Sequence, residues 1–302
     1  SGSYGMYYQG YSHENEAWRE SGTIVENNLF ENGFYGIYIA NQDNLNVSGN
    51  YIKIASVSNE HNYGIYLLHC YNEFEMIGNR IILDNTGNQK GLNLISCDGN
   101  DDGGEHFGII ANNMIATGGG TLLGGTTSEP FYSTGTTYKK FYHNTFHSYG
   151  AHTSGSSKSF YMNGPSDGHN TLRNNIFSCL NGTHIYISIG SAIDSSDYND
   201  YYSEAPDPDR WGYWDGEIHN LTELQAASGD DDSSMTVHPD YVDAFATATD
   251  LHLNRTSPVV DKGITLVEIT DDIDEEPRCL LYTSDAADEL DGVDLGGRRI
   301  IK

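Results

Sequence analysis

An asparagine with large apolar residues on both sides recurs along this chain, and it constrains the fold more than any other feature. A large apolar or aromatic residue stands two positions after each asparagine, and an apolar residue stands three positions before it in six of the seven repeats. Successive asparagines are separated by 22 to 34 residues. The asparagines are Asn28, Asn50, Asn79, Asn113, Asn144, Asn175 and Asn199. The residues two positions after them are Phe30, Ile52, Ile81, Ile115, Phe146, Phe177 and Tyr201. The residues three positions before them are Val25, Val47, Met76, Ile110, Phe141, Leu172 and Ser196.

This repeat predicts short strands wound into a solenoid. Short alternating segments are typical of strands, and the variable interval indicates loops of different length that leave a constant frame. One strand–loop–strand circuit cannot bury its own apolar face, so successive circuits must stack. Stacking at about 4.8 Å places equivalent residues above one another. We therefore predict an all-β fold, a single-stranded parallel β-helix of about seven coils, with inward apolar columns and an asparagine ladder at a corner where asparagine tolerates unusual backbone angles.

A second series of motifs lies between the asparagines and places tyrosines on the outside of the coil. The motifs are GIYI at Gly36, GIYL at Gly64, GLNL at Gly91, GTLL at Gly120, SFYM at Ser159 and HIYI at His184. Four tyrosines directly follow the expected inward residue: Tyr38, Tyr66, Tyr161 and Tyr186. Rows of outward tyrosines supply flat apolar faces with a hydroxyl, which suit sugar rings or protein partners. The alternative is that tyrosine is simply favoured in strands.

The repeat resembles the right-handed parallel β-helix repeat of the pectate-lyase-like superfamily over roughly residues 5–203. We expect residues 1–203 to form the β-helix, with a truncated N-terminus. Composition changes after Tyr202, and residues 204–278 resemble the C-terminal segment of secreted bacterial β-helix proteins. The resemblance implies that this segment caps the last coil with irregular strands and a short helix near Leu221 to Ala227. A cap is also expected physically, because an open end would expose apolar surface and unpaired strand edges.

Residues 279–302 differ from the rest of the chain. The strings CLLYTSDAADE at 279–289 and VDLGGRRII at 293–301 resemble, in the same order, the translation of two parts of a sequencing-library adaptor. We expect this segment to be non-biological, which implies an assembled environmental (metagenomic) sequence. The alternative is a genuine acidic tail. The segment is therefore left out of the fold prediction.

Charge limits the partners of this protein. The formal net charge is -28, and it is -26 without residues 279–302. Such a chain repels nucleic acid and anionic membranes, and it repels polyuronates unless a local basic cluster or Ca²⁺ bridges them. No stretch approaches the length of apolar sequence that crosses a membrane. We expect no nucleic-acid partner and no membrane insertion.

The repeat register also predicts which polar side chains share the outer surface. Tyr142 and Arg173 are equivalent positions of neighbouring coils, as is Asp197, and His143 and Lys140 lie close to them in sequence. A tyrosine or histidine beside an arginine can abstract a proton next to a carboxylate while the arginine offsets the charge that develops. This is polyuronate-lyase chemistry, and Tyr142, His143, Arg173 and Lys140 are the catalytic candidates. The alternative is an ordinary outward ladder with a surface Arg–Asp pair.

Two further groups of residues concern metal binding and disulfide formation. The loop DGNDDGGEH concentrates hard oxygen ligands that suit Ca²⁺, and its metal candidates are Asp98, Asn100, Asp101, Asp102 and Glu105. A solvated acidic loop is the alternative. Cys70 and Cys97 each lie six residues after the glycine of neighbouring motifs, so they should stack on adjacent coils, either as a disulfide or as a reduced inward pair.

These features predict a secreted or cell-surface bacterial protein that acts on an extracellular polysaccharide. The leading hypothesis is a polysaccharide lyase or related glycan-active enzyme, with Ca²⁺ as the candidate cofactor. The alternative is a non-catalytic adhesion or glycan-binding β-helix, and a weaker alternative is a trimeric phage tailspike. A monomer is expected for the first two.

Overall fold

The computed structural model describes residues 3–12, 18–55, 61–99, 103–119, 126–150, 157–204, 209, 211–244 and 249–278. The chain forms two compact units, residues 1–264 and residues 265–302. In the second unit only residues 265–278 are described, and there Asp271 and Pro277 form an isolated antiparallel bridge. All elements below belong to the first unit.

Three parallel sheets form the walls of the coil. Sheet A contains β1 (Tyr4–Gln9), β5 (Tyr35–Asp43), β8 (His61–Tyr71), β11 (Asn88–Ile95), β14 (Ser128–Thr134), β17 (Lys158–Asn163), β20 (Thr183–Ile187) and β23 (Gly212–Trp214), with β2 (Glu20–Ser21) beside β5 and the antiparallel β24 (Glu217–Ile218) at the far edge. Sheet B contains β3 (Ile24–Glu26), β6 (Asn46–Ser48), β9 (Glu75–Ile77), β12 (Gly108–Ala111), β15 (Lys139–Tyr142), β18 (Asn170–Arg173) and β21 (Ile193–Asp197). Sheet C contains β4 (Leu29–Glu31), β7 (Tyr51–Ile54), β10 (Arg80–Asp84), β13 (Met114–Gly118), β16 (Thr145–Ser148), β19 (Ile176–Cys179) and β22 (Asp200–Ser203).

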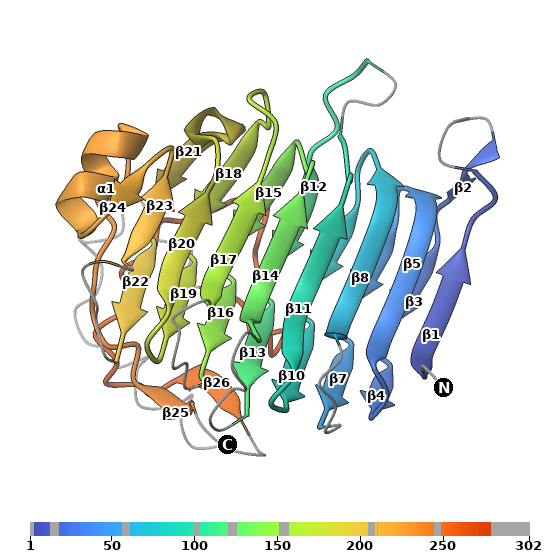
Figure 1. Cartoon of the computed structure of the whole chain (residues 1–302), viewed down its shortest axis with the longest axis horizontal. Coiled ribbons are helices and arrows are strands. Elements are labelled where there is room, and N and C mark those ends of the chain that lie inside the picture. Colours follow the sequence, from blue (N-terminus) through green and yellow to red (C-terminus); the bar gives the residue numbers. More distant parts are fainter. Residues whose placement is uncertain are drawn as a thin grey trace, which may run out of the picture. The chain divides into compact units, whose positions relative to one another are not determined.

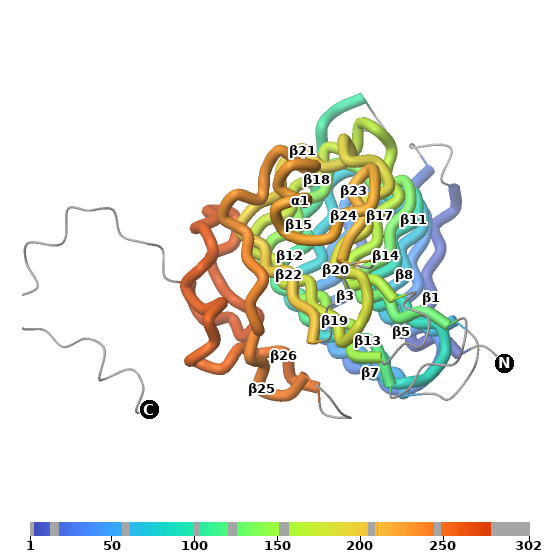
Figure 2. The backbone as a smooth tube through the Cα atoms, turned by 60° about the vertical axis from the view of Figure 1, so that its left-hand side comes forward, coloured from blue at the N-terminus to red at the C-terminus, as the bar shows by residue number. Residues whose placement is uncertain are grey.

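The chain visits sheets B, C and A in turn, and each coil pairs with the coil before it, so the fold is a parallel β-helix of seven complete coils (Figure 1). In Figure 1 the strands of sheet A run upward in front, sheet B lies behind them, and successive coils advance from right to left, which makes the coil right-handed. Figure 2 shows the three sheets as separate rows of strands around a common interior. Sheet A continues past residue 203 with β23.

The predicted inward columns are confirmed residue by residue. In sheet C, Phe30 pairs with Ile52, and the same register continues through Ile81, Ile115, Phe146 and Phe177 to Tyr201. In sheet B the register runs from Val25 through Leu172 to Ser196. From Ile52 onward, the sheet C residues of the column are buried, and they belong to one continuous core with the inward side chains of the other sheets. Alternation within each strand therefore places every second side chain in this core.

The asparagine ladder is also confirmed. The side-chain amide of each asparagine donates to the side-chain oxygen of the next, at 3.0 Å from Asn28 to Asn50 and 3.1 Å from Asn175 to Asn199. One expected detail is wrong: the left-handed backbone angle belongs to the preceding residue, as at Asn27 (φ 55°) and His143 (φ 55°). The ladder asparagine instead satisfies the backbone around that turn, since its amide also donates to a main-chain carbonyl of the preceding coil, as from Asn113 to Met76.

The motif glycines fill a corner with no room for a side chain. A Cβ atom on Gly64 would lie 2.4 Å from Ile81 Cγ2 and 2.6 Å from the carbonyl oxygen of Gly91. Gly36 and Gly91 are equally confined. The glycine therefore lets the chain turn from sheet C into sheet A directly against the inward isoleucine column.

The fourth motif was assigned to the wrong segment. GTLL at Gly120 lies outside the described residues, and the strand that pairs with β11 in sheet A is β14, where Phe131 pairs with Leu92 and Tyr132 with Asn93. The true member of the series is therefore PFYS, residues 130–133. The error arose because the connection from β13 to β14 is much longer than that from β10 to β11.

The segment after the last coil ends the ladder and covers part of the outside. The predicted helix is α1 (Leu221–Ser228), which begins at Asn220, whose side chain accepts from the Glu223 backbone, and ends at Gly229 in the left-handed conformation. The backbone N–H of Asn199 donates to Ser234 Oγ at 3.0 Å, where another coil would supply an asparagine. The antiparallel strands β25 (Tyr241–Asp243) and β26 (Asp250–Leu253) bring Tyr241 and Leu251 into an apolar cluster with sheet C residues.

Cys70 and Cys97 are buried free thiols, as is Cys179. Both belong to the core of the coil. The structure thus corresponds to the reduced inward pair rather than to the disulfide.

Candidate functional site

A column of tyrosines runs along the outer face of sheet A. Register places one residue of each strand in this column, from Tyr7 on β1 to Tyr213 on β23. We call its seven aromatic members the tyrosine stripe: Tyr7, Tyr38, Tyr66, Tyr132, Tyr161, Tyr186 and Tyr213. Asn93 on β11 stands between Tyr66 and Tyr132. All four substrate-binding candidates, Tyr38, Tyr66, Tyr161 and Tyr186, therefore share one column.

The rings of the stripe stack on each other. Ring centroids are 4.8 Å apart between Tyr7 and Tyr38 and 5.1 Å apart between Tyr38 and Tyr66. Beyond Asn93 the separations are 4.7 Å, 4.9 Å and 4.6 Å along the four remaining rings. A shorter parallel column of Tyr4, Tyr35 and Tyr63 widens the aromatic surface at the N-terminal end, with separations of 4.6 Å and 4.7 Å. The stripe is therefore a continuous aromatic surface on either side of Asn93.

Three stripe members escaped the sequence analysis. Tyr132 was missed with the PFYS motif, and Tyr7 and Tyr213 occur in the strings GMYY and GYW near the ends of the coil. Tyr7 and Tyr132 follow a large apolar residue, as the tyrosines of the other motifs do, whereas Tyr213 directly follows Gly212 and departs from that order.

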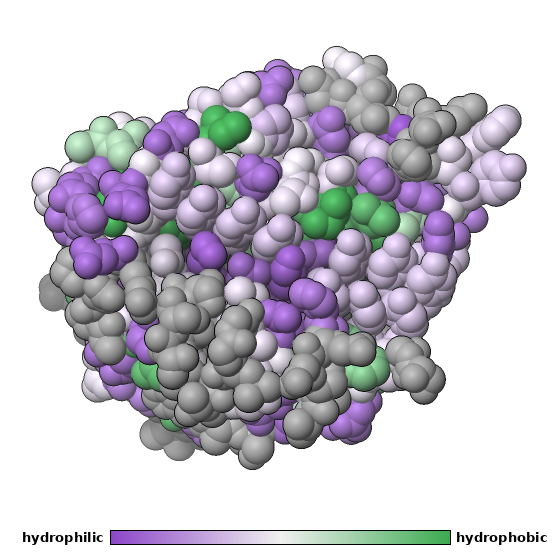
Figure 3. All heavy atoms as spheres, in the orientation of Figure 1, coloured by the Kyte–Doolittle hydropathy of each residue, from purple (hydrophilic) through white to green (hydrophobic). Residues whose placement is uncertain are grey.

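Burial raises the pKa of several stripe tyrosines above its ordinary value, so these hydroxyls keep their protons at pH 7. Partial burial, with nearby tyrosines adding to it, raises the pKa of Tyr38 to about 12, and burial also raises the pKa of Tyr132 and Tyr161. Except for the exposed Tyr7, the rings of the stripe are half-buried. Because neighbouring rings stack face to face, they present mainly their edges and hydroxyls to solvent. Figure 3 shows this face from the same side as Figure 1, with hydrophilic residues beside residues of intermediate hydropathy.

A charged column borders the middle of the stripe. Lys90 pairs in register with Glu129, and Lys158 occupies the equivalent position of the next strand. Lys90 Nζ lies 3.0 Å from the ring centroid of Tyr132, and Lys158 Nζ lies 5.5 Å from the ring centroids of Tyr161 and Tyr186. Burial raises the pKa of Glu129, and the two lysines oppose that rise, while burial lowers the pKa of Lys90. Sequence analysis missed this group because its members lie in differently composed motifs.

Asn93 adds an unsatisfied acceptor at the same place. The side chain is 2% exposed, and its Oδ1 atom has no hydrogen-bond partner among the described residues. A buried acceptor without a donor costs free energy that a ligand hydroxyl or a small rearrangement would recover. The centre of sheet A therefore combines aromatic faces, two cations, a buried carboxyl group and an unsatisfied amide.

The catalytic candidates lie on sheet B, away from the stripe. Tyr142 and Arg173 do pair in register, and Arg173 pairs in register with Asp197. Tyr142 is 6% exposed. The guanidinium of Arg173 lies 3.5 Å from Asp197 and 3.8 Å from Asp230, and it donates to Ser195. Two carboxylates thus already engage the cation that was expected to stabilise a substrate anion.

The remaining candidates near Tyr142 have structural partners as well. His143 Nε2 lies 3.1 Å from Asn174 Nδ2, and Asn174 in turn donates to the carbonyl of Ile264 at 2.7 Å. Lys140 Nζ lies 5.3 Å from the ring centroid of Phe107. A catalytic role for Tyr142, His143, Arg173 and Lys140 stays a prediction.

The candidate metal loop is only partly visible. Asn100, Asp101 and Asp102 lie outside the described residues. Asp98 accepts a hydrogen bond from Thr137 Oγ1, and Glu105 is exposed. Within the described ranges, no group of three or more histidine, cysteine or carboxylate side chains is arranged to hold a metal ion. Calcium binding stays a prediction.

Comparison of the chain with protein-family models, with curated proteins and with solved structures finds no match. In the part of the chain that the structure describes, no helix is both long and apolar enough to cross a membrane.

Proposed function

We propose that this protein binds an extracellular polysaccharide along the outer face of sheet A. The observation that carries this proposal is the tyrosine stripe, which places one tyrosine on each strand of the sheet A column except β11, where Asn93 stands. Sugar C–H groups can contact the exposed ring edges, and the tyrosine hydroxyls can exchange hydrogen bonds with sugar hydroxyls. The resemblance of the repeat to the pectate-lyase-like superfamily, with its implied bacterial secretion and monomeric state, agrees with this proposal.

The spacing of the stripe supports binding of a chain rather than of a single sugar. Coils repeat at about 4.8 Å, which is close to the length of one pyranose unit in an extended glycan. A glycan parallel to the coil axis therefore meets one tyrosine per sugar, except at Asn93. Its central sugar lies beside Lys90, Glu129 and Lys158, which supply both donors and an acceptor in a protein whose formal net charge is -28.

A second candidate function is cleavage of the bound glycan. The specific observation is Glu129, which is 5% exposed and whose pKa is raised by burial, beside the stripe. A carboxyl group whose pKa is raised can act as a general acid toward a leaving sugar oxygen. This reading places the chemistry on sheet A, whereas the sequence analysis placed lyase chemistry at Tyr142 and Arg173.

The test is affinity electrophoresis of the full chain through gels that contain neutral or acidic polysaccharides. At least one polysaccharide should retard the protein, and the double variant Tyr132→Ala with Tyr161→Ala should weaken binding about tenfold or more, because each lost stacking contact is worth about 1 kcal/mol. Tyr51→Ala is the matched control, since Tyr51 is a half-buried tyrosine on sheet C. Retardation that survives the double variant, or that Tyr51→Ala reduces equally, contradicts the proposal.

Cleavage is measured on the same polysaccharides by the appearance of new reducing ends. If the protein cleaves the glycan, new reducing ends should appear. Glu129→Gln should then abolish this activity while the variant is still retarded in the gel. Binding without new reducing ends supports a glycan-binding protein. Cleavage that depends on Arg173 and not on Glu129 would place the catalytic site on sheet B.

A further inference from the structure

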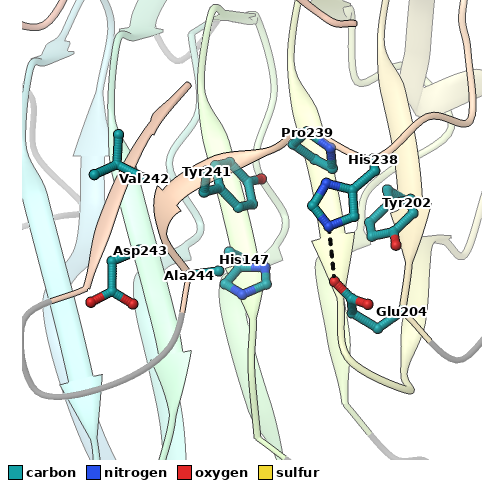
Figure 4. Close-up of a pocket in the computed structure, with 9 residues that line it drawn as sticks. All are labelled: His147, Tyr202, Glu204, His238, Pro239, Tyr241, Val242, Asp243 and Ala244. Atoms are coloured by element: carbon teal, nitrogen blue, oxygen red, sulfur yellow. Dashed lines mark ion pairs between the residues drawn. The ribbon is translucent and has the colours of Figure 1, made fainter. Parts of the chain in front are cut away.

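A pocket of about 240 Å³ lies on the outer face of sheet C, where the segment that contains β25 crosses the last coils (Figure 4). Its floor includes His147 of β16 and Tyr202 of β22, with Glu204 directly after β22. His238 and Tyr241 belong to the crossing segment. The pocket is separate from the tyrosine stripe, because these residues project from a different sheet.

The charged groups of the pocket are acidic. Glu204 and Asp243 contribute carboxylates, and no lysine or arginine is among the described residues that line it. Burial lowers the pKa of His147 to about 4, so this imidazole is neutral at pH 7. The pocket therefore favours a positively charged occupant and disfavours an anion.

The second histidine, His238, orients Glu204. The backbone N–H of Asp240 donates to His238 Nδ1 at 2.8 Å, so the ring proton sits on Nε2. Nε2 then donates to Glu204, with the two atoms 3.2 Å apart, as the dashed line in Figure 4 shows. The contact with His238 therefore orients the Glu204 carboxylate at the pocket.

Aromatic and apolar surfaces make up the rest of the pocket. The hydroxyl of Tyr241 lies 2.7 Å from Ser178 Oγ, which lies 2.8 Å from His147 Nδ1, so Tyr241 is held rigidly. The rings of Tyr202 and His238 meet edge to face at 4.8 Å. Pro239, Val242 and Ala244 complete the lining. Tyrosine faces beside a carboxylate attract organic cations, and apolar neighbours accept the alkyl groups that such cations carry.

We propose that this pocket binds a small organic cation, an alkylammonium group, with Glu204 as its counter-charge and Tyr202 as its aromatic contact. The inference does not depend on glycan binding at sheet A. An alkylammonium group needs acceptors and π faces, which the pocket supplies, and it needs no cationic donor from the protein. Its volume of about 240 Å³ is larger than either tetramethylammonium or choline, so both ions fit inside it.

Titration calorimetry of the full chain with tetramethylammonium chloride and with choline chloride tests this inference, with sodium chloride and glucose as reference titrants. Saturable binding of the two ammonium ions is expected, with Glu204→Gln weakening it about tenfold. Tyr202→Leu should weaken binding by several-fold, because it removes the π face while keeping an apolar side chain.

Glu26→Gln is the matched control, because it removes one negative charge at an exposed site on sheet B and should leave affinity unchanged. Near-ultraviolet circular dichroism of Glu204→Gln confirms that the variant is folded. No saturable binding of either ammonium ion, tighter binding of glucose, or equal effects of Glu204→Gln and Glu26→Gln would overturn the inference.

Discussion

Lys139 carries an amine into the interior of the coil. Its side chain is fully buried, its Nζ lies 4.6 Å from the ring centroid of Phe74, and that atom has no hydrogen-bond partner among the described residues. Burial lowers the pKa of Lys139 to about 8, an effect that the nearby Cys97 and Asp98 oppose. Folding therefore places an ammonium group where its charged form is disfavoured.

Lys139→Met should raise the free energy of unfolding at pH 7 by an amount on the order of 3 kcal/mol, since the pKa falls from 10.5 to about 8 on folding. Between pH 8 and pH 10.5 the unfolded chain binds more protons than the folded chain. The destabilisation caused by burying Lys139 is therefore full below pH 8 and disappears as the pH rises to 10.5. Urea unfolding at pH 7 and pH 10 measures both effects. A Lys139→Met protein less stable than the parent at pH 7 contradicts this account.

At the scale of the element, the asparagine ladder joins one coil to the next. Asn113 accepts from the backbone and side chain of Asn79, at 3.0 Å and 2.9 Å, and donates to Met76 and Asn144, at 2.7 Å and 2.9 Å. The side chain is fully buried. Each turn between sheets B and C is thus held by bonds to both neighbouring coils.

Asn113→Ala should lower the free energy of unfolding by about 2–4 kcal/mol, because it leaves several buried polar groups without partners. Asn28→Ala is the matched control: Asn28 is exposed, and it bonds to Asn50 on one side only among the described residues. This substitution should cost less than about 1 kcal/mol. Equal losses in urea unfolding would show that the ladder does not stabilise the interior coils.

The elements that repeat were predictable, and the elements formed by distant segments were not. The columns at Phe30 and Val25 follow from local spacing, because the coil repeats the same backbone path. The register of Tyr132 was missed, because loop length between β13 and β14 is not fixed by the frame. Glu204 and His238 meet only because β25 folds back over sheet C, and no short-range pattern encodes that contact.

At the scale of the whole molecule, the expected state in solution is a monomer. Among the described residues, Ser234 takes the place of a further ladder asparagine and Met235 forms a bridge to Asp200 of β22, so the segment after β22 pairs with part of the C-terminal edge of the coil. Static light scattering should report a mass of about 33.3 kDa for the full chain. A trimer would favour the tailspike alternative instead.

The central claim is that the tyrosine stripe on sheet A is the surface that recognises a glycan. Its most direct test is a crystal structure of the full chain with an oligosaccharide cut from the polysaccharide that retards it most strongly. We expect sugar rings packed along the edges of Tyr132, Tyr161 and Tyr186, parallel to the coil axis. An oligosaccharide bound against Tyr142 and Arg173 on sheet B, with sheet A left bare, would contradict it.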